Sequence, residues 1–259
     1  MMIKTVALIQ ARMTSSRLPG KVLKDIGGCP MLLRVVDRAK QAKNIDIVAV
    51  ITSMHESDDA IEQCCNENGV QVFRGNLDDV LDRYYQAAIH FQADNIVRIT
   101  ADCPLLDPAI SDLVVVTFKN GDYDYVSNTI ECTYPDGLDT EVFRFDALKR
   151  AWQLANLKSE REHVTAYIYK HPELFRLGIV MHSEDYSELR WTVDNQADLD
   201  FVRSVYANFD SNHFGMTEIL RFMEEHPEVS SINAGQLRNE GYLKSLREDM
   251  EIKTNRKEK

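Results

Sequence analysis

The sequence lacks several features that would place it in a broad functional class. It has no apolar run near the roughly 18 residues of a membrane span, and no signal-peptide pattern opens it. It has no excess of positive charge, because 41 acidic residues outnumber 30 basic ones and give a net charge of −11. A general nucleic-acid binder usually carries a basic surface, so this balance argues against that class. We expect the partner to be a small molecule.

Cysteine pairs and common nucleotide motifs are also missing. The five cysteines are odd in number and contain no CxxC pair, which favours free thiols in a reducing cytoplasm. The chain has neither the G-x-x-x-x-G-K-[ST] of a P-loop nor the G-x-G-x-x-G of a Rossmann fold. No internal repeat or low-complexity linker divides the 259 residues, a length that suits one large α/β domain or one domain with a modest appendage.

The first hundred residues alternate between β-branched runs and segments of helical spacing. Continuous apolar strands alternating with amphipathic helices imply the α/β class, with a mostly parallel central sheet covered on both faces, an α/β/α sandwich. The predicted strands are residues 3–9, 45–51, 70–73 and 95–100, and the predicted helices are residues 31–42, 58–68 and 79–91.

After about residue 123 the pattern is less regular. Ser159 followed three positions later by Glu162 reads as a capping box at the start of a helix. The charged tail beyond about Tyr242 is expected to fray or be disordered. The predicted strands are residues 123–127, 141–145, 175–181 and 189–193, and the predicted helices are residues 145–157, 161–171, 196–206 and 217–225.

No acidic residue occurs before Asp25, so the loop after the first predicted strand has a local positive charge. It presents Arg12, Arg17 and Lys21, and a Pro-Gly pair bends it just before Lys21. The carboxyl edge of an open α/β sheet binds ligands, and fixed cations with exposed backbone N–H groups form a cradle for a polyphosphate. A basic surface turn is the alternative interpretation.

Two carboxylates follow predicted strands, Asp102 after residues 95–100 and Asp194 after residues 189–193. Parallel strands share one carboxyl edge, so both are expected near the basic loop. Each could instead cap a helix, although Asp107 before Pro108 is the better cap for the helix that follows Asp102. Magnesium is normally bound by one or two carboxylates together with phosphates and water, and these two supply that pair.

The spacing Q-A-R-x-x-S-x-R-L-P-G-K resembles the opening signature of the sugar cytidylyltransferases. Further blocks extend the resemblance over about residues 3–206 and are similar to the spore-coat-polysaccharide-protein-F type of this family, which is related to the acylneuraminate and 3-deoxy-manno-octulosonate cytidylyltransferases. The matching blocks are IQARMTSSRLPGKVL, FRGNLDDVLDRYYQAA, VRITADCPLLDP, DYDYVSNT, TYPDGLDTEVF, SEREHVTAYI and LRWTVDNQADL.

This resemblance implies a nucleotide-diphosphosugar-transferase-like fold, dependence on Mg²⁺ and a homodimer. It implies that Arg12, Arg17 and Lys21 contact the triphosphate, and that Asp102 and Asp194 hold the metal. The nucleotidyltransferase domain is expected over residues 1–226, with acceptor and dimerisation elements within about residues 123–188. Residues 227–259 are expected to form a partly flexible extension.

Other polar residues of these blocks are candidates for the rest of the nucleotide site. Gln10 and Ala11 precede the phosphate loop, while Thr52 and Arg74 end the second and third predicted strands. For Thr52 and Arg74 a role as turn residues is the alternative.

The acceptor candidates come from two later blocks. Asp136, Asp139 and Glu141 suit hydroxyl recognition, and Arg161 could pair with an acidic sugar. His163 is expected to line a cleft or a dimer seam, and no general base is assigned. The apolar spacing of residues 159–171 predicts a dimer interface, with burial in the same subunit as the alternative.

The sequence therefore predicts a Mg²⁺-dependent enzyme that forms a CMP-sugar and pyrophosphate from CTP and an acidic sugar, for surface polysaccharide or glycan biosynthesis. Arg12, Lys21, Asp102 and Asp194 are the predicted catalytic residues. Two alternatives stay open: a glycosyltransferase that uses a prebuilt nucleotide-sugar, and a noncatalytic nucleotide-binding protein.

Overall fold

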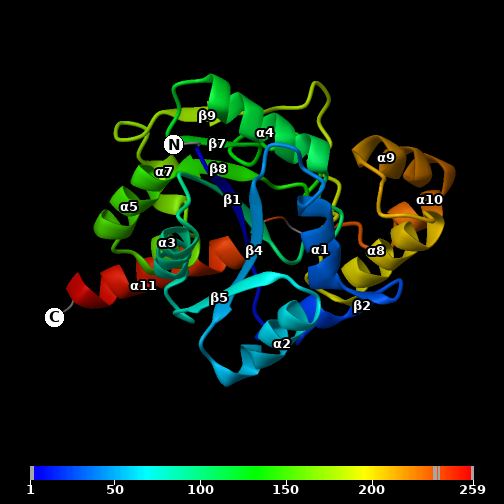
Figure 1. Ribbon diagram of the computed structural model, residues 1–259, viewed down its shortest axis with the longest axis horizontal. Coiled ribbons are helices and arrows are strands. Elements are labelled where there is room, and N and C mark those ends of the chain that lie inside the picture. Colours follow the sequence, from blue (N-terminus) through cyan, green and yellow to red (C-terminus); the bar gives the residue numbers. More distant parts are fainter. Residues whose placement is uncertain (1–2, 236–237, 239, 258–259) are drawn as a thin grey trace.

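The computed structural model describes residues 3–235, 238 and 240–257, and it is built around one seven-stranded sheet in the order β5-β4-β1-β6-β8-β7-β9 (Figure 1). Within the described chain β8 alone runs antiparallel to the other strands of this sheet, which confirms the mostly parallel prediction. The strands are β1 (Thr5–Gln10), β4 (Ile47–Ser53), β5 (Gln71–Gly75), β6 (Asn95–Thr100), β7 (Tyr125–Ser127), β8 (Glu141–Arg144) and β9 (Leu177–Ile179).

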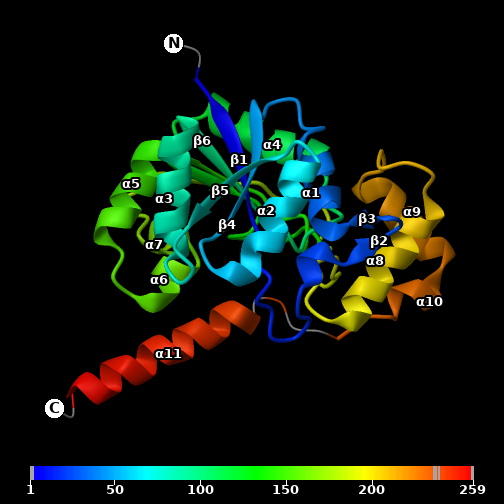
Figure 2. The same ribbon diagram turned by 60° about the horizontal axis from the view of Figure 1, so that its bottom comes forward.

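Helices cover both faces of the sheet, because the central strands are apolar on both sides (Figures 1 and 2). Along β1, Ala7 and Ile9 belong to one hydrophobic core, and Val6 and Leu8 to the other. The first core includes side chains of α1 (Met31–Ala39), α2 (Asp59–Glu67), α4 (Pro108–Asn120), α8 (Gln196–Asn208) and α9 (Met216–Glu225). The second includes α3 (Val80–Phe91), α5 (Phe145–Leu154) and α7 (Ala166–Lys170). This is the predicted α/β/α sandwich.

The early elements match the predictions to within a few residues, and the caps on α3 and α4 behave as their sequences suggest. Asp79 accepts a hydrogen bond from the N–H of Asp82, and Asp107 accepts one from Ala109 with Pro108 in the first turn. Asp102 is therefore not needed as the cap of α4.

The predicted strand at residues 189–193 is wrong. The segment runs as a loop beside the sheet, and its only described bridge pairs Arg190 with Asp136. Its N–H groups bond to loop carbonyls, as when Trp191 donates to Asp136 at 2.6 Å and Val193 donates to Asp102 at 2.8 Å. The apolar side chains of Trp191 and Val193 are buried, which explains the strand-like pattern.

The helix predicted at residues 161–171 is broken in two. Val164 has a φ of 55° and separates α6 (Lys158–Glu162) from α7. A β-branched residue is strained in this conformation, and the complete burial of its side chain holds it there. The capping box starting at Ser159 is also wrong, because Glu160 accepts the N–H groups of Asn156 and Leu157, so Ser159 lies inside the helix.

The chain beyond α9 continues into α10 (Pro227–Ser230) and α11 (Glu240–Lys257), and α11 projects from the body of the molecule (Figure 2). Short elements complete the fold: the 3₁₀ turns η1 (Lys21–Leu23) and η2 (Glu56–Asp58), and the small hairpin of β2 (Asp25–Ile26) with β3 (Cys29–Pro30). All five cysteines are free. No helix within the described residues has the length and apolar character of a membrane span.

Candidate active site

Lys21 lies between the two carboxylates that the sequence predicts as a pair. Its Nζ donates to Asp102 Oδ2, to Asp194 Oδ1 and to the carbonyl of Val193, each at 2.8 Å. Gly20 sets up this position with a φ of 67°, which turns the loop after β1 into η1. The structure therefore brings together Lys21, Asp102 and Asp194 at the carboxyl edge of the sheet. It corrects one expectation, because the Lys21 side chain is only 10% exposed and is not a free loop cation.

Asp194 is held by two further cations. Its Oδ2 pairs with Arg17 at 2.8 Å and with Arg190 at 2.7 Å. Asp194 does not cap α8, because Asn195 accepts the N–H of Asp198 and takes that role. The carboxylate of Asp194 is therefore directed to the cations of the site and not to the start of α8.

The electrostatics of this cluster keep all three groups charged near neutral pH. Burial acts to raise the pKa of Asp102, but the charge and hydrogen bond of Lys21 outweigh it and lower this pKa to about 2. The pKa of Asp194 is lowered in the same way, with burial opposed by Lys21 and Arg17. Burial alone would lower the pKa of Lys21, and the two carboxylates raise it above its usual value.

Asp58 anchors the start of the basic loop to the sheet. It is fully buried and accepts the N–H of Met13 at 2.8 Å, together with the N–H and hydroxyl of Ser53 at the end of β4. These bonds outweigh its burial and lower the pKa of Asp58. The sequence did not single out Asp58, although a carboxylate shortly after a strand is a signal for such an anchor.

The other predicted nucleotide contacts lie along the same sheet edge. Gln10 ends β1, Ala11 is buried, and Arg12 is exposed in the loop that follows. Thr52 is completely buried near the end of β4. Arg74 pairs with Asp59 and Glu62 and donates to two backbone carbonyls, so its described contacts connect it to α2 and not to Lys21.

Asp136 and Asp139, two of the predicted acceptor residues, are each paired with an arginine that was not among the predicted site residues. Asp136 pairs with Arg190 at 3.0 Å, and Asp139 pairs with Arg238 at 2.7 Å. Burial and the charge of Asp139 raise the pKa of Asp136 to about 7. The only signal for Arg190 in the sequence is its place in the matching block LRWTVDNQADL. Arg238 lies in residues 227–259, which were expected to be partly flexible, so nothing in the sequence indicated a place for it in the site.

Close backbone packing holds the loop at Gly137 against the 190–194 segment. Gly137 has a φ of 116°, and a Cβ there would lie 2.6 Å from the backbone of Trp191 and Thr192. Only glycine permits this approach. Asn233 adds a bond from its Nδ2 to the carbonyl of Arg190 at 2.9 Å. The segment after α10 thus buttresses the site.

The other three predicted acceptor residues, Glu141, Arg161 and His163, already form hydrogen bonds or ion pairs with other side chains of the protein. Glu141 is buried against Arg98, Tyr125 and Thr165. Arg161 forms a bidentate ion pair with Asp79 at the start of α3.

His163 bonds through Nε2 to Ser245 of α11 at 3.0 Å and packs edge-on against Tyr242. Burial, helped by the charge of Arg98, lowers the pKa of His163 to about 4. The structure therefore places His163 under α11, in its neutral form near pH 7.

Asp102 and Asp194 fit a hard divalent cation by their chemistry. Both offer carboxylate oxygens, and both are ionised near neutral pH, as magnesium requires. Lys21 takes the cationic position between them. Among the described residues no three acidic, histidine or cysteine side chains converge into a larger metal cluster, so the two carboxylates need phosphate and water oxygens to complete a shell.

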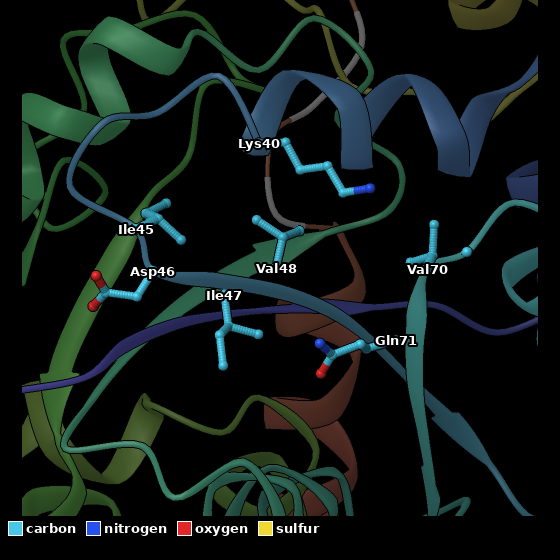
Figure 3. Close-up of a pocket in the computed structure, with 8 residues that line it drawn as sticks. Lys40, Ile45, Asp46, Ile47, Val48, Val70 and Gln71 are labelled. Atoms are coloured by element: carbon cyan, nitrogen blue, oxygen red, sulfur yellow. The ribbon is translucent and has the colours of Figure 1, made fainter.

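A hollow of about 250 Å³ lies elsewhere, where β4 and β5 begin (Figure 3). Its lining includes Lys40, Asp46 and Gln71. This is the amino edge of the sheet, opposite the edge that binds ligands in such folds. We therefore assign the site to the cluster around Lys21.

Comparison with known proteins agrees with this geometry. A family model described as cytidylyltransferase matches residues 6–226. The spore coat polysaccharide biosynthesis protein SpsF of Bacillus subtilis is 32% identical over 234 residues, which cover 86% of this chain and 95% of that protein. A cytidylyltransferase structure from Leptospira borgpetersenii superimposes with a TM-score of 0.86 at 33% identity, covering 92% of this chain and 99% of that one.

A more distant structure shares the fold. It is a CMP:2-keto-3-deoxy-manno-octonic acid synthetase complexed with CTP, with a TM-score of 0.63 at 22% identity over 79% of this chain and 99% of that one. The chain therefore belongs to the cytidylyltransferase family of nucleotidyltransferases.

Proposed function

We propose that this protein forms a CMP-sugar and pyrophosphate from CTP and an acidic sugar, with Mg²⁺ as cofactor. The observation that carries the proposal is the buried Lys21 between Asp102 and Asp194, at the sheet edge where the basic loop emerges. The name of the Bacillus relative links that protein to spore coat polysaccharide biosynthesis, and we propose surface polysaccharide or glycan biosynthesis for this one. The supply of CTP favours a cytoplasmic location.

The reaction is a nucleotidyl transfer. A sugar hydroxyl oxygen forms a bond to the α-phosphorus of CTP, the bond from that phosphorus to the bridging oxygen of pyrophosphate breaks, and the hydroxyl proton leaves to solvent or to an unassigned base. The protein's main tasks are to position the reactants and to neutralise developing charge. Mg²⁺, when held by Asp102 and Asp194, would neutralise phosphate charge.

Lys21 and the arginines act on the phosphates. Arg12 is exposed in the loop, and Arg17 is 41% exposed while paired with Asp194. Both can turn toward a triphosphate without leaving a buried position. Lys21 now donates to Asp102 and Asp194. If a metal were bound by these two carboxylates, Lys21 would donate to a phosphate oxygen instead, and this charge-assisted bond would replace a bond to a carboxylate.

On the acceptor side we assign recognition to Asp136 and Asp139. Arg161 is less suited to a sugar carboxylate than the sequence suggested, because Asp79 holds its guanidinium. Arg190 and Arg238 are the cations beside Asp136 and Asp139, and they are our candidates for pairing with an acidic sugar.

Pyrophosphate release tests the proposal. The purified protein is incubated with Mg²⁺, each of CTP, UTP, ATP and GTP, and a panel of acidic sugars, with neutral sugars as controls. We expect release with CTP and at least one acidic sugar, and mass spectrometry should show the CMP-sugar. Release of free nucleotide from a prebuilt nucleotide-sugar, without pyrophosphate, would instead identify a glycosyltransferase.

We also propose a homodimer. Val164 and Ile168, which motivated an interface at residues 159–171, are completely buried within one chain. Only the partly exposed members of that segment, such as Tyr167 stacked on His171, are left to meet a second copy. Light scattering of the wild type and of Tyr167→Glu tests this, and a wild-type monomer with full activity contradicts it.

A further inference from the structure

The proposed transfer releases the proton of a sugar hydroxyl, and most carboxylates around the site are already engaged. Lys21 holds Asp102 and Asp194. Asp198 is completely buried, accepts the N–H of Asp194 at 2.9 Å and pairs with Arg190. These three carboxylates therefore already serve the cations of the site and its backbone.

Two other titratable groups of this region are held by contacts within the protein. Glu141 pairs with Arg98 and accepts hydrogen bonds from Tyr125 and Thr165. His163 lies under α11, where its Nε2 bonds to the last turns of the chain. Neither group is placed to meet a sugar hydroxyl beside the phosphates.

Asp136 differs from these groups because one of its carboxylate oxygens lacks a close cation. Its Oδ2 accepts a hydrogen bond from Arg190 Nη1 at 3.0 Å. Its Oδ1 is 3.8 Å from Arg238 Nε, which is longer than a hydrogen bond. The side chain is 13% exposed, so the carboxylate is partly open to solvent. Asp136 can therefore accept a further hydrogen bond without losing its pair with Arg190.

The backbone fixes the position of Asp136 from both sides. Its N–H donates to the carbonyl of Leu189 at 2.9 Å, and its carbonyl accepts from Trp191 at 2.6 Å. The next residue, Gly137, packs directly against the backbone of Trp191. A group that takes part in proton transfer has to be held in place in this way, because small displacements are costly in rate.

Arg190 relates Asp136 to the carboxylates around Lys21. Its Nη1 donates to Asp136, and its Nη2 donates to Asp194 Oδ2 at 2.7 Å. A guanidinium is planar and rigid, so Asp136 and Asp194 are held one guanidinium apart. A hydroxyl bound at Asp136 would therefore lie beside the place proposed for the phosphates.

Asp139 in the same loop is the alternative carboxylate. It is 32% exposed, and its Oδ1 accepts from Arg238 at 2.7 Å. This ion pair leads to Arg238 and not to Arg190, so it does not connect Asp139 to Asp194 as Arg190 connects Asp136. The geometry therefore favours Asp136.

We propose that Asp136 is the general base of the reaction, an inference that rests on the proposed nucleotidyl transfer. Oδ1 of Asp136 accepts the proton of the sugar hydroxyl while the hydroxyl oxygen bonds to the α-phosphorus. The bond from that phosphorus to the bridging oxygen of pyrophosphate breaks in the same step. The carboxylic acid formed at Asp136 then returns its proton to solvent.

The surroundings of Asp136 suit a base that works near neutral pH. Burial and the charge of Asp139 raise the pKa of Asp136 to about 7, although the charges of Arg238 and Arg190 act to lower it. A general base is most effective when its pKa lies near the working pH. The charged and titratable groups that face Asp136 are Asp102, Cys103, Cys132, Asp139, Arg190 and Arg238.

The test follows turnover against pH with Mg²⁺, saturating CTP and the acidic sugar that supports pyrophosphate release. In the wild type, kcat/KM for the sugar should rise with pH up to about 7 and then level off, because the base has to be ionised. Asp136→Asn keeps the size of the side chain but not its basicity, so kcat should fall by about 10²- to 10⁴-fold and lose this rise. Calorimetry should show unchanged binding of CTP with Mg²⁺.

Asp139→Asn is the matched control, because Asp139 lies in the same loop and also pairs with an arginine. Its KM for the sugar should increase, whereas the rise of turnover with pH should stay. Formate added to Asp136→Ala should restore part of the turnover, because a small carboxylate can replace the missing base. Formate should not restore turnover in Asp139→Ala.

Several results would overturn the inference. A wild-type kcat in Asp136→Asn, or a lower kcat with the same pH dependence and no rescue by formate, makes Asp136 a binding or structural residue. Loss of the pH dependence in Asp139→Asn moves the base to Asp139. A wild-type profile that is flat around pH 7 excludes Asp136 whether or not the variants fold. If no sugar gives pyrophosphate with CTP, the proposed function itself fails, which is distinct from a reaction that proceeds without Asp136.

Discussion

Arg190 pairs with Asp194 at 2.7 Å and so connects the loop at Asp136, the proposed acceptor side, to the carboxylates around Lys21. The same guanidinium contacts Asp136 and Asp198, each at 3.0 Å, and its side chain is 7% exposed. One buried cation therefore orients three carboxylates, one from the loop at Asp136 and two from the segment that carries Asp194 and Asp198. Arg190 and Asp194 are four positions apart, but the segment between them is a loop, so their contact is not the i,i+4 pairing of a helix.

Replacing Arg190 by methionine should therefore affect both stability and the site. Removing one partner of a buried ion pair typically costs about 3–5 kcal/mol, and here three carboxylates lose a partner. We expect a clear fall in the unfolding temperature and weaker turnover. Arg176→Met, which removes an arginine paired with Asp124 at the surface, should change little. A stable and fully active Arg190→Met variant would contradict this role.

Lys21→Ala should impair turnover of the nucleotide. Losing a charge-assisted phosphate contact costs about 1.5–3 kcal/mol, or roughly 10- to 150-fold in rate. Because Lys21 also separates Asp102 from Asp194, the variant should be less stable as well, more so at pH 7 than near pH 4, where protonation relieves their repulsion. Steady-state kinetics over limiting CTP and a pH series of melting curves measure both effects. Lys24→Ala in the same loop is the control, and wild-type turnover in Lys21→Ala would reject the assignment.

Asp102→Asn and Asp194→Asn should each weaken the response of turnover to Mg²⁺, because the amide keeps the size of the side chain but loses its charge. If both hold one ion, the losses in the double variant should be smaller than the sum of the single losses. Titration of activity with Mg²⁺ measures this. Additive effects would argue against a shared site, and a normal titration in one variant would remove that residue from it.

His163 should make the protein sensitive to mild acid. The folded pKa of His163 is about 4 and the unfolded value is near 6.5, so the folded state disfavours the proton. Its contribution to stability is complete above pH 6.5 and is lost as the pH falls from 6.5 to 4, by up to about 3 kcal/mol.

Urea unfolding of the wild type and of His163→Gln over this pH range measures the effect. In the wild type the free energy of unfolding should fall as the pH is lowered, and His163→Gln should lose much of this dependence. His213→Gln, which changes an exposed histidine, should keep it. If the free energy of unfolding depended on pH equally in the wild type and in His163→Gln, His163 would not be the group that causes the acid sensitivity.

The sequence by itself determined the sheet and the main partners of the site. The strands β1, β4 and β6 are buried on both faces, and a strand in that environment consists of a continuous apolar run. Their position in the centre of the sheet could therefore be predicted from their composition. Parallel strands share a carboxyl edge, which is why Lys21 and Asp102 could be predicted to meet across 81 positions of sequence.

Only the tertiary structure decided the rest of the site, because contacts between distant loops leave no periodic signal. Trp191 and Val193 look like strand residues, yet their segment bonds to loop carbonyls. Val164 breaks a helix through burial that its neighbours in sequence do not reveal. Arg161 and Arg190 look equally available in the sequence, and the fold pairs the first with a helix cap and the second with Asp194. Which charge meets which is decided by the packing of segments far apart in the chain.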